Sequence, residues 1–146
     1  MLLTDADSLP SSTQRQRVNT RFMRLLDLSS EFQLVTLDSD KRREAEDYIQ
    51  ARFRAAYHAD INEFHGELLT MHCAGGLSAI AGISKAAHRQ LFLEQYTELL
   101  VEKELARIKR HEVDRHSIVE IGNLVATNNG SSLALFVVLA SVLSRA

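Results

Sequence analysis

A strand, a glycine-containing turn and a helix follow one another in the last third of the chain. Residues 118–124 (IVEIGNL) read as a strand, and they lead into residues 126–143 (ATNNGSSLALFVVLASVL), whose second half is almost entirely apolar. A turn of this kind places free backbone N–H groups at the start of a helix, where they can bind a phosphate group. The pattern therefore predicts a sheet with a helix packed on it, and a candidate anion site at their junction.

The other segments predict an α/β (α+β) fold, with a mixed sheet flanked by helices. Apolar alternation and short apolar runs bounded by turns predict strands at residues 32–37, 67–73, 77–86 and 118–125. Apolar residues at helical spacing predict helices at residues 42–58, 98–109 and 131–143. The last helix is apolar nearly all round, so we expect it to be buried. This order of strands and helices is typical of α/β and α+β proteins.

The composition of the chain limits which kinds of protein it can be and which partners it is expected to bind. The 146 residues are enough for one domain with its own core, and we place it at residues 31–146, after a lead-in at residues 1–30 that carries the only proline. A net charge of −2 argues against a nucleic-acid partner. One cysteine and six histidines without metal-ligand spacing argue against a disulfide framework and a metal site. Without a secretory signal, the expected compartment is the cytoplasm, with secretion by another route left open.

Two blocks of this sequence resemble the bacterial thermostable haemolysin family. The first is LFLEQY, residues 91–96, and the second is IVEIGNL, residues 118–124, followed by Gly130. The resemblance covers roughly residues 31–146, and the family is similar in fold to the GNAT N-acyltransferases. Residues 64–66 (Phe-His-Gly) depart from it, because the family tends to have a Phe-Met-Pro-like turn there. The family also continues for several more strands, so we expect this domain to be incomplete at its C-terminal end.

The resemblance implies transfer of an acyl group from acyl-CoA, or another acyl thioester, to an amine. In GNAT relatives the loop at this place binds the pyrophosphate of coenzyme A through its backbone amides. The donor-binding residues would then be Thr127, Asn128, Asn129, Gly130, Ser131 and Ser132. Thr127 stands where those relatives have Gln or Arg. From the residues alone, the segment also fits an ordinary Asn/Gly turn with a serine cap on the helix.

Three polar residues are candidates for catalysis. Strand alternation places Glu120 on one face of its strand and Asn123 on the other. A carboxylate in an apolar strand is costly unless it is paired or protonated, and a raised pKa would suit a general base. The alternative is a structural ion pair of Glu120 with Arg115, Arg89 or a lysine. Glu94 either lines a substrate cleft or caps the next helix.

Two other functions stay open on the sequence. The family name implies a membrane-lytic factor, although no basic membrane-binding face supports membrane contact. The chain could also be an inactive truncated domain. A truncated sheet would leave the strand at residues 118–125 near an open edge and the helix at residues 131–143 incompletely covered. Such surfaces associate, so we expect a homodimer through an exposed sheet edge.

Overall fold

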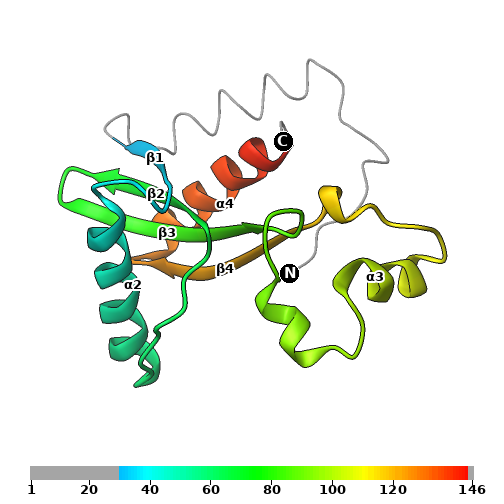
Figure 1. Cartoon of the computed structure of the whole chain (residues 1–146). Coiled ribbons are helices and arrows are strands. Elements are labelled where there is room, and N and C mark those ends of the chain that lie inside the picture. Colours follow the sequence, from blue (N-terminus) through cyan, green and yellow to red (C-terminus); the bar gives the residue numbers. More distant parts are fainter. Residues whose placement is uncertain (1–29, 145–146) are drawn as a thin grey trace, which may run out of the picture.

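The computed structural model describes residues 30–144, in which four strands form one antiparallel sheet (Figure 1). The strands are β1 (Glu31–Val35), β2 (Glu67–Cys73), β3 (Gly76–Lys85) and β4 (Val119–Ala126), in the spatial order β1-β2-β3-β4. The α+β class is confirmed. The expectation of a mixed sheet is wrong for the described strands, because all three pairings are antiparallel. The predicted lead-in lies outside the described residues, apart from residue 30.

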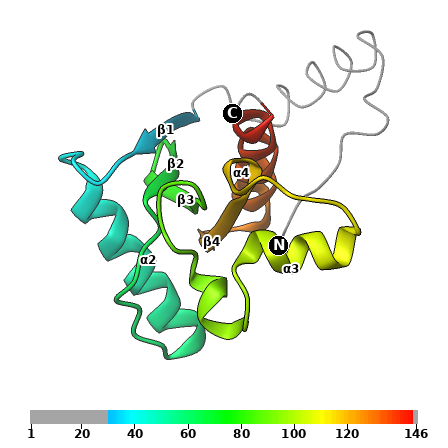
Figure 2. The ribbon, with the colours of Figure 1, turned by 45° about the vertical axis from the view of Figure 1, so that its right-hand side comes forward.

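Three α-helices and two short 3-10 helices complete the described part of the chain. The α-helices are α2 (Arg42–Tyr57), α3 (Val101–Lys109) and α4 (Asn129–Leu143), and the 3-10 helices are η1 (Phe92–Tyr96) and η2 (Arg115–Ser117). α2 and α4 lie on opposite faces of the sheet, and α3 lies beyond one end of it (Figure 2). The three predicted helices are thus confirmed, with starts displaced by up to three residues.

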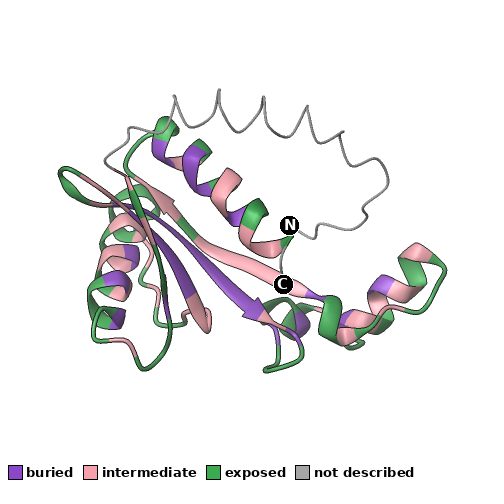
Figure 3. Ribbon diagram, turned by 90° about the horizontal axis from the view of Figure 1, so that it is seen from above, coloured by how far each residue is buried: buried purple, intermediate pink, exposed green. Residues whose placement is uncertain are grey.

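The two central strands divide the core between these two helices. Leu69 and Ile83 pack towards α4, whereas Leu68 and Ile80 pack towards α2. Side chains alternate along a strand, so β2 and β3 supply apolar residues to both faces. Both strands are therefore largely buried (Figure 3), which explains why they read as apolar runs.

α4 is buried on one side only, so the expectation that this helix is buried holds for one face, and the expectation that it is incompletely covered is confirmed. Leu135 and Leu139 face the sheet, whereas Leu133 is 55% exposed and Phe136 is 45% exposed. The described sheet has β4 at its edge, as expected. Because β4 is the last strand on this side of the described sheet, no further described strand extends beneath α4, and part of its apolar surface stays exposed.

A bulge interrupts the pairing of β4 with β3. Gly122 pairs with Gly82 and Val125 pairs with Ile80, so three steps along β4 match two steps along β3. Asn123 takes up the extra residue with a φ of 46°. The prediction that Glu120 and Asn123 face opposite ways assumed unbroken alternation and is wrong, because both contact His65.

Within residues 30–144, no helix combines the length and the apolar character that crossing a membrane requires.

Candidate functional site

His65 occupies the centre of the site, on the loop that leads into β2. Its imidazole lies over Gly82 and Gly122, which pair with each other across β3 and β4. A Cβ at residue 82 would lie 2.9 Å from the Cβ of His65, and a Cβ at residue 122 would overlap its Nε2 atom. Glycine inside a strand often marks such a close approach. The two glycines therefore form the surface on which the imidazole rests.

Hydrogen bonds fix the position of His65 from several elements. Its Nδ1 atom lies 2.8 Å from the Ser84 hydroxyl, and its backbone N–H donates to Oδ1 of Asn123 at 3.0 Å. Arg42 donates to the backbone carbonyls of His65 and Gly66, at 2.7 and 3.1 Å. The loop is thus attached to α2, β3 and β4, and the histidine is held in place before any ligand binds.

The environment of His65 favours the neutral imidazole. Burial lowers the pKa of His65, and Arg89 and Arg42 lower it further, whereas the Glu120 carboxylate, 3.9 Å from Nδ1, opposes them. Among the described residues, every buried side-chain nitrogen or oxygen atom has a hydrogen-bond partner. Nε2 has no such partner in the structure, so this atom is open to the neighbouring cavities. In the tautomer whose Nδ1–H donates to the Ser84 hydroxyl, Nε2 is unprotonated and can accept a proton.

Two cavities meet at His65. One has a volume of about 410 Å³ and the other about 550 Å³, and both are lined by Glu63, His65 and Phe92. The first extends to Arg89 and Glu120, and the second extends along Gly122 to α2. Volumes of this size are typical of small-molecule sites. His65 thus lies in the wall of a cleft that is large enough for a small substrate.

Glu120 also lines the cleft, and its partners differ from those expected. Its carboxylate accepts backbone N–H groups of Phe92 and Leu93, at 2.9 and 2.8 Å, at the start of η1. The alternative of an ion pair with Arg115 is wrong, because that guanidinium binds Glu94 and Glu102. Glu120 therefore ties the wall of the cleft to β4 and places a negative charge beside the imidazole. Its catalytic role stays a prediction.

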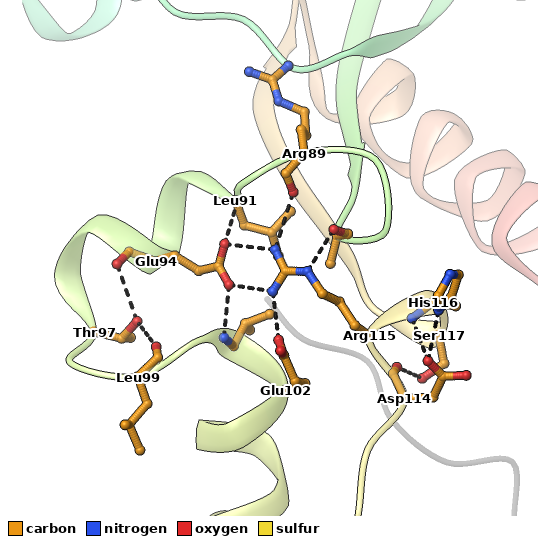
Figure 4. A network of polar contacts seen from close by, with 12 residues as sticks. Arg89, Leu91, Glu94, Thr97, Leu99, Glu102, Asp114, Arg115, His116 and Ser117 are labelled. Carbon is orange, nitrogen blue, oxygen red and sulfur yellow. Dashed lines mark hydrogen bonds and ion pairs between the residues drawn. The ribbon is translucent and has the colours of Figure 1, made fainter.

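Glu94 lies in a separate polar network (Figure 4). Its carboxylate receives hydrogen bonds from Arg115, at 2.6 and 3.0 Å, and from the backbone N–H groups of Leu91 and Val101, at 2.8 and 3.0 Å. The hydrogen bonds from Arg115, helped by those from the backbone, lower the pKa of Glu94 to about 2. Val101 is the first residue of α3, so Glu94 caps this helix, which was one of the two roles predicted for it.

The turn before α4 is fastened to β3 by several of the predicted donor-binding residues. Asn128 is the N-cap, and its Oδ1 accepts the N–H of Ser131 at 2.8 Å. The Ser131 hydroxyl lies 2.6 Å from that of Ser78, whose carbonyl accepts the N–H of Thr127 at 2.9 Å. Asn129 and Gly130 are exposed at the helix N-terminus, and Ser132 is half-buried. Ser132 also lines a cavity of about 70 Å³ between β4 and α4.

Comparison with known proteins places the whole site inside one family. The family model described as thermostable hemolysin matches residues 35–146, and this region contains the two glycines, His65 and the turn before α4. The chain belongs to the thermostable haemolysin family. No curated protein and no solved structure matches the chain. The resemblance of LFLEQY and IVEIGNL to the thermostable haemolysins is thereby confirmed.

Sequence reasoning missed the central residue of this thermostable haemolysin site. His65 lies in a loop, and its partners Ser84, Glu120 and Asn123 are distant in the sequence. The available signal was a glycine inside each of two predicted strands, which indicates close approach of another group. A second signal was the departure from the family pattern at residues 64–66.

In the described part of the chain, no three His, Cys, Asp or Glu side chains are grouped to hold a metal ion.

Proposed function

We propose that this thermostable haemolysin family member transfers an acyl group from a thioester such as acyl-CoA to an amine. The main supporting observation is that β4 runs from the cleft, where an acceptor would bind, to the N-terminus of α4, where a donor would bind. Glu120 of β4 lines the cleft together with His65, which lies against Gly122 of the same strand, and the end of β4 leads directly to the exposed N-terminus of α4. An acceptor in the cleft and a donor at the helix N-terminus would thus approach along the same strand.

In the proposed reaction, His65 carries the proton. The acceptor reacts as the uncharged amine, and Nε2 accepts a proton from it as the amine nitrogen attacks the thioester carbonyl carbon. The C–N bond forms, the C–S bond breaks, and the proton passes from Nε2 to the departing thiolate. Products are an amide and a free thiol, so atoms and charge balance. Glu120 stabilises the transient imidazolium, and Asn123 acts as a positioning residue through the backbone N–H of His65.

The donor would lie at the start of α4. Its N-terminal backbone N–H groups carry partial positive charge, which favours a phosphate group. Asn129 and Gly130 are exposed there, so their amides are accessible to a pyrophosphate. Thr127, Asn128 and Ser131 use their side chains to hold the turn in place, so they would act by shaping it.

Two measurements with the purified full chain test the proposal. Coenzyme A should raise the melting temperature, because a ligand that binds only the folded state stabilises it. Release of free thiol from acyl-CoA should require an added amine, and His65→Gln should lose this activity while still binding coenzyme A. A folded sample that shows no thermal shift at millimolar coenzyme A would contradict the donor site.

A lytic action on membranes is the second candidate, and exposed apolar side chains from η1 to the start of α3 favour it. Tyr96 is 71% exposed, Leu100 is 52% exposed and Phe92 is 49% exposed. Apolar groups of this kind can insert into the interfacial region of a bilayer. Leakage of dye from liposomes at micromolar protein would support this function, and intact liposomes would remove it.

A further inference from the structure

We infer that the cleft beside His65 binds an amine that also carries a carboxylate, and that Arg89 binds this carboxylate. The inference names the acceptor class of the proposed acyl transfer, and so it rests on that function for the reaction. Binding of the acceptor needs no donor, so it is tested separately. Three features of the 410 Å³ cavity carry the inference: an unpaired guanidinium, two carboxylates and an apolar wall.

Within residues 30–144, Arg89 has no acidic partner, and in this it differs from Arg42 and Arg115. Arg42 pairs with Glu46, and Arg115 pairs with Glu94 and Glu102. Among the described residues, the side chain of Arg89 has one hydrogen bond, a long one of 3.5 Å to the carbonyl of Phe64. A guanidinium in a cavity wall with most of its N–H groups unused is well suited to bind a carboxylate through two parallel hydrogen bonds.

The backbone of Arg89 is held in place while its side chain is left free. Its carbonyl accepts a hydrogen bond from Arg115 at 3.3 Å, so the Glu94 network fixes this part of the loop. Figure 4 shows the guanidinium of Arg89 directed away from that network. The guanidinium of Arg89 can therefore bind a ligand, because Glu94 and Glu102 pair with Arg115 and not with Arg89.

The acidic groups in the same cavity fit the other end of the ligand. Glu63 and Glu120 line it together with Arg89, so the wall carries both signs of charge. A carboxylic acid without an amine would meet these two carboxylates, and an amine without a carboxylate would leave Arg89 unpaired. A molecule that carries both groups satisfies both ends of the wall.

Part of the remaining wall is apolar, beside the polar side chains of Ser84, Gln90 and Gln95. Phe64, Leu91 and Phe92 line the cavity, and the Phe92 ring packs edge-on against Tyr96 with ring centres 5.6 Å apart. This surface fits an apolar side chain. The structure thus points to an α-amino acid with an apolar side chain as the acceptor.

The test measures binding to the donor-free full chain by saturation-transfer NMR and titration. The probes are L-phenylalanine, L-leucine and L-methionine, each compared with its primary amide, which keeps the amine and lacks the carboxylate. We expect at least one acid to bind about tenfold or more tightly than its amide, since a charged hydrogen-bonded contact is lost. Arg89→Gln should remove this difference, and Arg89→Lys should retain part of it.

Arg43→Gln is the matched control, because Arg43 is an exposed arginine that lines neither cavity. Its binding should equal that of the unmodified protein. Binding of the acid and the amide with equal affinity would overturn the inference, and so would an Arg89→Gln variant that binds like Arg43→Gln. No binding by any of the three acids would overturn it as well. Absence of acyl transfer together with carboxylate-dependent binding would instead refute only the proposed reaction.

Discussion

The imidazole of His65 lies against Gly122 with no space for a methyl group between them. Gly122→Ala should therefore displace the histidine, since the new Cβ would overlap Nε2. We expect acyl transfer to fall by at least tenfold, and the free energy of unfolding to fall by about 1–3 kcal/mol, the usual cost of overpacking. Thiol release and urea unfolding measure the two effects.

Gly75→Ala is the control for this substitution. Gly75 lies in the β2–β3 turn, and a Cβ there would meet nothing within 4 Å. Activity and stability should both stay close to those of the unmodified protein. If Gly122→Ala behaves like Gly75→Ala, the close packing of His65 on β4 has no role in the site.

Protonation of His65 should link stability to pH. Burial lowers the pKa of His65 below its ordinary value of 6.5, so between these two pKa values the unfolded chain binds more protons than the folded one. The contribution of His65 to the free energy of unfolding is therefore complete above pH 6.5 and declines as the pH falls towards the folded-state pKa. His65→Gln should flatten this decline in denaturant titrations. His111→Gln, at an exposed histidine, should leave it unchanged.

Acid sensitivity should also depend on Glu94. Its side chain is 2% exposed and its pKa is about 2, against an ordinary value of 4.5, so its contribution is complete above pH 4.5 and is lost as the pH falls towards 2. Glu94→Gln should cost about 3 kcal/mol at neutral pH, because it leaves Arg115 short of a partner and sets an amide NH₂ against donor groups. Urea unfolding at pH 7 and pH 3 should show a smaller difference in the variant. Glu98→Gln, at an exposed position nearby, should change little.

The exposed side of α4 and the position of β4 at the edge of the described sheet lead us to expect a homodimer. Leu133 and Phe136 are exposed on the helix, and Phe136 lines a cavity with Leu124 of β4, so apolar surface lies next to the edge strand and favours association. Sedimentation should show a dimer at high concentration. The double substitution Leu133→Ser and Phe136→Ser should shift the protein to a monomer. A monomer at every concentration before substitution would contradict the expectation.

Much of the fold could be predicted, because in most strands and helices the local sequence pattern agrees with the burial of the same residues in the folded protein. β2 was predicted with its observed bounds, since an apolar run that is buried on both faces has an unambiguous signal. α3 begins at Val101, later than predicted, because Glu94 caps its first N–H from seven residues upstream. α4 begins earlier than predicted, because the N-cap is Asn128 and not a serine. The division of the chain at residue 30 stays a prediction.

The site was less predictable because its contacts join distant segments. Glu120 was singled out as a candidate base, which stays a prediction; it lines the cleft, but its partners are backbone N–H groups of η1, which no side-chain pattern reveals. Asn123 was assigned to the wrong face because a bulge cannot be seen in an alternating apolar pattern. The sequence signals for His65 were indirect: a glycine inside each of two predicted strands, and the departure from the family pattern at residues 64–66.

The extra residue in β4 links the register of this strand to the position of His65. Before Asn123, Ile121 packs towards α4, and after it Val125 packs towards α2, so a single residue reverses which helix each later side chain meets. Deletion of Asn123 would restore regular pairing, with Val125 still opposite Ile80, but it would remove both the bulge and the acceptor for the His65 N–H. The bulge in β4 and the histidine pocket are therefore one structural unit, and a change to either is expected to alter the other.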